Sequence, residues 1–152
     1  MSDDLVFAMG EFQASFPVDR QYANNHMWAM REGDRYRFGF TAYAVRLLQD
    51  VYFLDWSVDA PATLSSGQEI GAIESKKAES TLYAPISGKL LEFNPAVIQD
   101  PSAINTDKYV GGWLFEMESN AAVLLSPREY VEQLEAVWEK TQRTIKGQMN
   151  TD

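Results

Sequence analysis

Two adjacent lysines, Lys76 and Lys77, stand in the short polar stretch GAIESKKAES between two runs of apolar residues. An amine at the apex of a rigid turn can be acylated by an enzyme, because a fixed side chain needs little further ordering on binding. The apolar segments 70–73 and 82–86 are expected to fix such a turn in space. Taken alone, however, a lysine in a polar loop is usually only a solvated charge. The pattern leaves both interpretations open.

The other reactive residues do not form a recognisable catalytic or metal site. The chain has one histidine, His26, and no cysteine, which excludes disulfides, zinc–thiolate sites and a cysteine nucleophile. No nucleophile-elbow motif accompanies His26, so a structural role is expected for it. Gly111-Gly112 lacks the lysine and the spacing of a phosphate-binding loop. We therefore expect no metal, no catalytic residue and no independent enzyme, with a hydrolase that uses His26 as an alternative.

Composition limits the partners. A chain of 152 residues with 45% hydrophobic residues is expected to form one folded domain. The net charge of −9 argues against nucleic acid or an anionic membrane as a partner. The acidic N-terminus does not resemble a signal peptide, and no apolar run approaches the length of a membrane span. These features predict a soluble, cytoplasmic protein.

The central region has the pattern of short antiparallel strands. Tyr36, Phe38 and Phe40 alternate with polar or small residues, which predicts a half-buried strand. The remaining expectations are a short helix over 41–48, a well-buried strand over 51–56, β segments over 68–73, 81–86 and 89–94, a long connection over 95–109 and a strand over 111–118. Turn residues separate these segments, and the lysine turn and the Ser87-Gly88 turn are expected to form a compact pair of hairpins. The pattern favours a small antiparallel sandwich or flattened barrel.

The two ends differ from this pattern. Residues 1–24 show no clear period and are expected to form an extended arm or a short helix. Ser126 and Glu129 form a capping box around Pro127, so a helix is predicted to begin there. Its apolar positions are Tyr130, Leu134, Val137, Trp138, Thr141 and Ile145, with Lys140, Arg143 and Lys146 near the end and Gly147 as the stop. The predicted divisions are 1–24, 25–125, 126–147 and a tail over 148–152.

Several motifs, in order, resemble the H protein family of the glycine cleavage system, which belongs to the biotinyl/lipoyl carriers. The resemblance covers about residues 25–117 and rests on the segments GFTAYA, GAIESKKAES, YAPISGKLLEFN and INTDKYVGGWLF. It implies a mainly β fold, the lipoyl/biotinyl-type flattened barrel or hammerhead sandwich, with short helices and a C-terminal helix. Residues 25–125 would then be the lipoyl-carrier domain.

The resemblance implies covalent lipoate on Lys77. The attachment motif is Glu74, Ser75, Lys77 and Ala78, with Lys76 at the variable position. A biotin site fits less well, because biotinylated lysines are flanked by methionine. The lipoyl arm would carry intermediates between partner enzymes, with a lipoyl ligase or transferase attaching it.

Two positions depart from the family pattern. Where the family has His-Glu-Trp, this chain has His26-Met27-Trp28, and Thr81 stands where an aspartate is common. The family's cationic aminomethyl cargo would need carboxylates in its cleft, which Met27 and Thr81 do not supply. We expect the arm to dock near His26, Met27, Trp28 and Thr81.

Three functions follow from this comparison. The departures favour an H-protein-like lipoate carrier of sulfur intermediates beside heterodisulfide reductase-like enzymes. The first alternative is the glycine cleavage H protein, with glycine cleavage enzymes as partners. The second is an unmodified interaction module.

Overall fold

The computed structural model describes the backbone of residues 3–150 and the side chains of residues 3–138. The elements follow one another as β1 (Leu5–Met9), β2 (Phe12–Phe16), β3 (Gln21–Tyr22), β4 (Met27–Glu32), β5 (Arg35–Phe40), α1 (Ala42–Leu48), β6 (Val51–Trp56), β7 (Ala62–Leu64), β8 (Glu69–Ser75), β9 (Glu79–Tyr83), β10 (Gly88–Phe93), α2 (Pro95–Gln99), α3 (Ala103–Thr106), β11 (Phe115–Glu118) and α4 (Pro127–Asn150). The expected mainly β fold with short helices and a C-terminal helix is confirmed. Among the described residues, no helix is long and apolar enough to cross a membrane.

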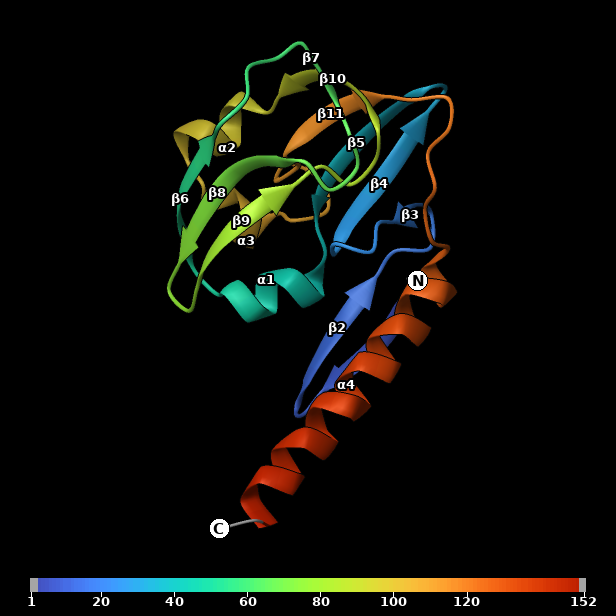
Figure 1. Ribbon diagram of the computed structural model, residues 1–152, viewed down its shortest axis with the longest axis vertical. Coiled ribbons are helices and arrows are strands. Elements are labelled where there is room, and N and C mark those ends of the chain that lie inside the picture. Colours follow the sequence, from blue (N-terminus) through green and yellow to red (C-terminus); the bar gives the residue numbers. More distant parts are fainter. Residues whose placement is uncertain (1–2, 151–152) are drawn as a thin grey trace.

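Two antiparallel sheets form the body of the protein (Figure 1). One has six strands in the order β3-β4-β5-β11-β10-β7, and the other has three strands in the order β6-β8-β9. Phe38 on β5, Ile73 on β8 and Leu90 on β10 are each at most 1% exposed and belong to one apolar cluster. The core therefore lies between the sheets, and its burial supplies the main stabilising free energy.

The helix α1 joins the two sheets at one end of the body. Thr41 caps its first turn, since the Thr41 hydroxyl accepts a hydrogen bond from the N–H of Ala44. The helix ends at Leu48, and Gln49 follows with φ of 58°. This left-handed residue turns the chain directly into β6.

The N-terminal segment is a β-hairpin rather than the expected arm or short helix. Strands β1 and β2 pair in register around Gly10, which has a φ of 65°. Phe7 and Phe16, on the inner face, are buried in a second apolar cluster with Trp28 and Tyr130. Apolar residues alternate with polar ones along β2, at Phe12, Ala14 and Phe16, so a period of two was present there and was missed, whereas β1 is apolar at every position.

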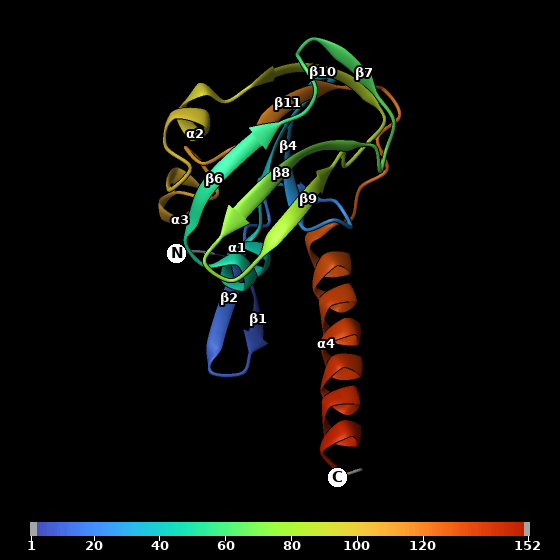
Figure 2. The ribbon, with the colours of Figure 1, turned by 60° about the vertical axis from the view of Figure 1, so that its left-hand side comes forward.

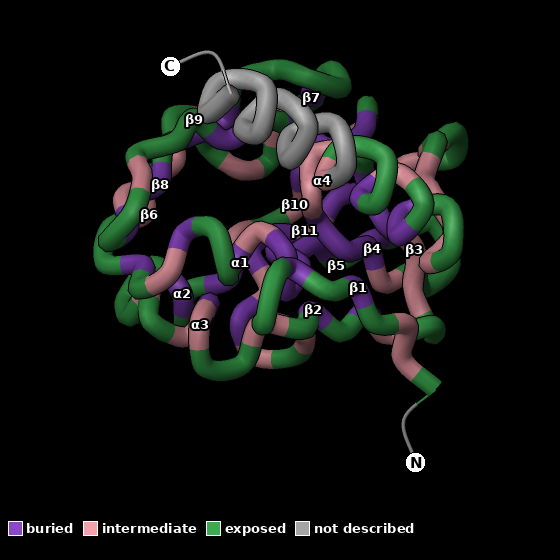
Figure 3. The backbone as a smooth tube through the Cα atoms, turned by 90° about the horizontal axis from the view of Figure 1, so that it is seen from below, coloured by how far each residue is buried: buried purple, intermediate pink, exposed green. Residues whose placement is uncertain are grey.

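The C-terminal helix α4 projects from the body on the same side as this hairpin (Figure 2). The capping box is confirmed: Ser126 N–H donates to Glu129 Oε1 at 2.8 Å, and Glu129 N–H donates to Ser126 Oγ at 3.1 Å. Tyr130 and Leu134 are buried and pack against the hairpin, but Val137 is 49% exposed, which corrects its expected place on the apolar face. In the tube view, buried segments gather around β3, β4 and β1 near the start of α4 (Figure 3).

The helix continues to Asn150, so the expected stop at Gly147 is wrong. A glycine inside a helix costs only about 1 kcal/mol relative to alanine, which a long helix tolerates. The expected positions of the Thr141 and Ile145 side chains, and of the basic residues Lys140, Arg143 and Lys146, lie outside the described side chains.

Three further expectations differ from the structure. Strand β6 is not well buried, because Tyr52 is 62% and Phe53 is 45% exposed on the three-stranded sheet, which has one open face. The lysine hairpin and the Ser87-Gly88 turn do not form a compact pair, since β9 and β10 belong to different sheets. The long connection over 95–109 contains the short helices α2 and α3.

Candidate functional site

The two lysines form the apex of the β8–β9 hairpin. Glu74 pairs with Glu79 at the end of the β8–β9 ladder, and Ser75 bonds Ala78, so Lys76 and Lys77 are the two central residues of the turn. Ser75 closes the turn, because its N–H and its Oγ both donate to the carbonyl of Ala78, at 2.9 Å and 3.0 Å. The Ala78 N–H in turn donates to Ser75 Oγ at 3.2 Å. The loop is therefore much shorter than the polar stretch 71–80.

The turn is also held from outside. The N–H of Lys76 donates to the carbonyl of Asp50 at 2.8 Å, and that of Lys77 donates to the carbonyl of Leu48 at 3.3 Å. These carbonyls come from the end of α1 and the segment that follows it, so the apex is anchored to the helix. Both lysine side chains are exposed. The main chain of the apex is thus fixed while the two amines remain accessible.

A groove of about 310 Å³ begins next to the lysine apex, since Ala78 is one of its lining residues. Its walls come from the start of β4, from α1 and from the β8–β9 hairpin. The lining residues are Asn25, His26, Met27, Phe40, Ala44, Leu47, Leu48, Ile73, Ala78, Ser80, Thr81, Leu82 and Tyr83. Apart from His26, none of these described side chains is ionisable near neutral pH. The groove therefore suits a largely apolar group attached at the apex.

Three of the four residues expected to hold the arm line this groove: His26, Met27 and Thr81. Trp28 does not line it and is buried in the other apolar cluster, where its Nε1–H donates to the carbonyl of Lys108 at 2.9 Å. Neighbouring side chains on a strand point to opposite faces. Met27 and Trp28 at the start of β4 therefore belong to different apolar clusters. The expectation that both would contact the arm, because they are neighbours in the sequence, is wrong for Trp28.

His26 is held by the C-terminal helix. Its Nδ1 lies 2.9 Å from the hydroxyl of Tyr130, and its ring centroid lies 4.8 Å from that of Tyr43. The backbone of His26 has a φ of 69°, a left-handed conformation that is uncommon outside glycine. Burial lowers the pKa of His26, because the charged imidazolium loses hydration there. The ring is therefore neutral near pH 7.

Asn25 is a groove residue that the sequence analysis missed. Its Nδ2–H donates to the carbonyl of Tyr83 at 3.1 Å, which fixes the orientation of the amide because a carbonyl only accepts. The opposite atom, Oδ1, is buried and has no hydrogen-bond partner among the described residues. A buried acceptor without a partner is costly and indicates a place for a donor. In the sequence, the only indication that Asn25 belongs to the groove was its position directly before the His26-Met27-Trp28 motif.

The hairpin carries a pair of like charges beside the apex. Glu74 and Glu79 lie directly opposite each other on β8 and β9, on one face of the sheet. Like charges in this arrangement destabilise a sheet slightly. The pair places two carboxylates beside the two lysine amines of the apex, where they can contact basic groups of a partner protein.

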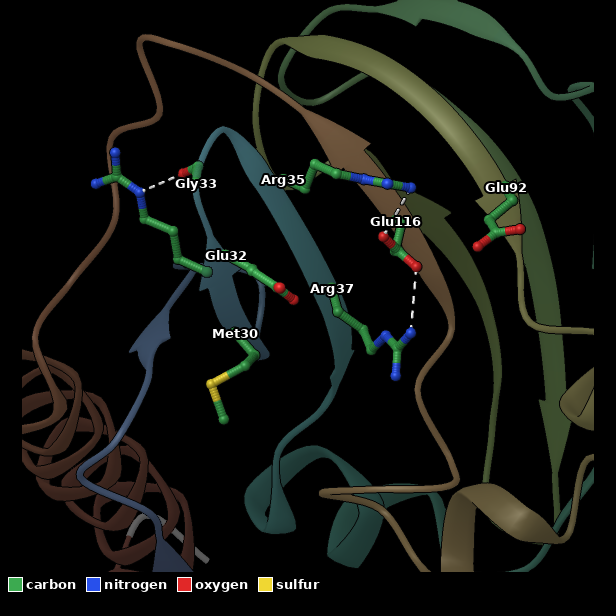
Figure 4. Close-up of a pocket in the computed structure, with 8 residues that line it drawn as sticks. Met30, Glu32, Gly33, Arg35, Arg37, Glu92 and Glu116 are labelled. Carbon is green, nitrogen blue, oxygen red and sulfur yellow. Dashed lines mark hydrogen bonds and ion pairs between the residues drawn. The ribbon is translucent and has the colours of Figure 1, made fainter.

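A larger depression, about 820 Å³, lies on another part of the surface and does not include the lysine apex (Figure 4). Three of its charged side chains pair with one another: Glu116, whose side chain is 12% exposed, lies 3.3 Å from Arg35 and 3.2 Å from Arg37. The sticks show both guanidinium groups directed at this carboxylate (Figure 4). We therefore attribute this region to surface ion pairing, and the candidate site remains the apex with its groove.

Comparison with known proteins agrees with this geometry. The family model described as glycine cleavage H-protein matches residues 20–140. A glycine cleavage system H protein of Rubrobacter xylanophilus is 39% identical over 123 residues, which cover 80% of this chain and 97% of that protein. One from Escherichia coli O7:K1 is 36% identical over 108 residues, covering 70% and 83% respectively.

A solved structure shows the same fold. The crystal structure of a glycine cleavage system H protein from Mycobacterium marinum matches with a TM-score of 0.71 and 37% identity, covering 79% of this chain and 99% of that one. The names of these relatives favour the glycine cleavage alternative over the sulfur-oxidation interpretation, for which they give no support. The β1–β2 hairpin precedes the region matched by the family model. On the family match and these relatives together, the chain belongs to the glycine cleavage H-protein family.

Proposed function

We propose that this chain is a lipoate-carrying H protein of the glycine cleavage system, with lipoate bound as an amide on Lys77. The observation that carries the proposal is the joint geometry of the apex and the groove. An exposed amine stands on an anchored turn, and a neutral groove begins at the next residue, Ala78. A carrier needs both features, one for attachment and one for holding the attached arm.

The residues of the attachment motif have different roles in presenting Lys77 and in forming the groove. Ser75 closes the turn with its hydroxyl, and Ala78 presents only a methyl group to the groove. Glu74 and Glu79 offer two carboxylates beside the apex to basic groups of a lipoyl ligase or transferase. Lipoate, when bound, supplies a reversible disulfide to a chain that has no cysteine of its own.

The groove also has to hold a protonated amine, the cargo that glycine cleavage requires. Met27 and Thr81 supply no carboxylate, but Oδ1 of Asn25, which is buried and has no partner among the described residues, can accept a hydrogen bond from an ammonium group once the docked arm opens the groove wall over it. A neutral acceptor holds a cation less strongly than a carboxylate does. We therefore assign to Asn25 the role of acceptor for the amine.

Partners follow from this role. The chain would be loaded and unloaded by glycine decarboxylase and aminomethyltransferase, and modified by a lipoyl ligase. As a carrier, the protein is their substrate and not a catalyst.

The test is lipoylation by a competent ligase, followed by intact-protein mass spectrometry. One lipoyl amide is expected on the unsubstituted chain and on Lys76→Arg, and none on Lys77→Arg, which keeps the charge and removes only the acceptor amine. Lipoylated chain should then support glycine-dependent turnover with the two partner enzymes. Modification that persists in Lys77→Arg, or lipoylated chain that gives no turnover, would contradict the proposal.

A further inference from the structure

A buried chain of hydrogen bonds connects the C-terminal helix to the groove. The Tyr130 hydroxyl lies 2.9 Å from Thr41 Oγ1 and 2.9 Å from His26 Nδ1. Tyr130 belongs to α4, Thr41 caps α1, and His26 lines the groove. Thr41 and Tyr130 are both fully buried, so water does not complete their hydrogen bonds.

The direction of these bonds follows from the proton on Thr41. Its Oγ1 already accepts from the N–H of Ala44, and within the described residues the only available acceptor for its own proton is the oxygen of Tyr130. A buried hydroxyl proton without an acceptor is costly, so Thr41 donates to Tyr130. Burial raises the pKa of Tyr130, which keeps its hydroxyl protonated, and that proton is then left to donate to Nδ1 of His26.

We propose that Tyr130 is a positioning residue for the groove: its hydroxyl holds His26 as the neutral tautomer that carries its proton on Nε2. This inference rests on the proposed function, because it assigns a role to His26 toward the docked arm. With Nδ1 accepting, His26 presents an N–H donor and no free lone pair to the groove. It serves acceptor atoms of the arm, such as the amide oxygen, and leaves an ammonium cargo to Asn25 Oδ1.

The surroundings of His26 support a fixed tautomer. The titratable groups that contact it are the phenols of Tyr43 and Tyr130, and no charged side chain lines the groove within the described part of the chain. Tyr130 is itself held by the stacked ring of Tyr22, with centroids 4.8 Å apart, and by the edge of Phe16 at 5.2 Å. Ring packing thus fixes the position of the Tyr130 hydroxyl, and the hydrogen bond from this hydroxyl fixes the orientation of the His26 imidazole.

The test is ¹⁵N NMR of the imidazole of His26, the only histidine, near neutral pH. The unsubstituted chain should show Nδ1 at the shift of an unprotonated nitrogen and Nε2 at that of a protonated one. Tyr130→Phe keeps the ring packing and removes only the hydroxyl, and it should give mixed tautomers. Tyr22→Phe is the matched control, since it removes a buried hydroxyl that bonds the Pro17 carbonyl instead, and it should leave the spectrum unchanged.

A second readout addresses the arm. In lipoylated and reduced protein, alkylation of the dithiol by iodoacetamide should be about 2- to 10-fold faster in Tyr130→Phe, the range that one hydrogen bond corresponds to, and unchanged in Tyr22→Phe. An unsubstituted chain with its proton on Nδ1, a Tyr130→Phe spectrum identical to that of the unsubstituted chain, or equal alkylation rates would each overturn the inference. Absence of lipoate on Lys77 would instead overturn the proposed function, while the tautomer result still decides the role of Tyr130.

Discussion

Ser75 and Ala78 are bound to each other across the lysine turn by the hydroxyl of Ser75, which donates to the Ala78 carbonyl at 3.0 Å and accepts from the Ala78 N–H at 3.2 Å. Two-residue hairpin turns commonly rely on residues with positive φ. Neither Lys76 nor Lys77 has a positive φ. The serine hydroxyl and the carbonyls at the end of α1 take over the stabilising role, so ordinary residues can occupy the apex.

Ser75→Ala should loosen this turn. The substitution removes two hydrogen bonds at a site that is 4% exposed, so we expect the free energy of unfolding to fall by about 1–2 kcal/mol. The rate of lipoylation should fall as well, because the ligase must then order the apex on binding. Urea unfolding and timed mass spectrometry measure the two effects. Ser57→Ala, on an exposed site, serves as the control; a lipoylation rate in Ser75→Ala equal to that of the control would show that rigidity of the apex is unimportant.

Glu79→Gln should separate stability from ligase recognition. Removing one of the two facing carboxylates relieves repulsion with Glu74 and should raise the free energy of unfolding by about 0.2–0.5 kcal/mol. Ligase association should become slower, since an attractive charge is lost. Stopped-flow or initial-rate kinetics at low salt measure this change. Glu69→Gln, on the same hairpin but opposite Tyr83, is the matched control, and an equal loss of rate in both variants would contradict a specific role for the pair.

His26 should make stability depend on pH. Because burial lowers its pKa in the folded state, the unfolded chain binds the proton more readily. The stabilising contribution of the neutral ring is therefore complete above about pH 6.5, and it is lost as the pH falls toward the folded-state pKa. Denaturant titrations from pH 7.5 to pH 5 should show a smaller loss of stability in His26→Asn, which tolerates the left-handed backbone at this position. Parallel curves for the two proteins would rule out this linkage.

Asn25→Ala should weaken retention of the amine cargo without affecting attachment of lipoate. A hydrogen bond to a charged group contributes about 1.5–3 kcal/mol. The covalently bound cargo must leave the groove before it is hydrolysed from the arm, so this hydrolytic loss should be about 10- to 100-fold faster. Mass spectrometry of the loaded protein over time gives this rate. Asn24→Ala, one residue earlier and exposed, should behave like the unsubstituted chain. Equal rates for the two variants would exclude Asn25 as the acceptor.

Thr81→Asp should strengthen retention of the same cargo. Thr81 is exposed on β9 and lines the groove, so a carboxylate fits there without burial. An exposed ion pair contributes at most about 1 kcal/mol, which predicts cargo loss about 2- to 5-fold slower. The effect should disappear at high salt. Thr63→Asp, exposed on β7, controls for the added charge; slower loss in both variants would point to net charge and not to the groove.

Elements of structure that depend on only a few neighbouring residues could be predicted from the sequence. The alternation of Tyr36, Phe38 and Phe40 predicted a strand, and the spacing of Ser126 and Glu129 predicted the start of α4. The position of Lys77 at a turn apex was also predictable, because turn chemistry and flanking apolar runs are local signals. The hairpin over residues 5–16 had the same kind of signal and could have been found.

The sequence by itself determined strands β5, β6 and β8 to β11, the cap of α4 and the motif that singles out Lys77, since each depends on contacts between residues close in the chain. Only the tertiary structure decided which residues share the groove. It joined Met27 to Thr81 and placed Trp28 on the opposite face of β4. It also left Asn25 Oδ1 without a partner among the residues that the structure describes, and it connected Tyr130 to His26 across 104 positions of the chain. The physical reason is that sheet order and helix docking are set by burial of the whole apolar surface, which no local pattern specifies.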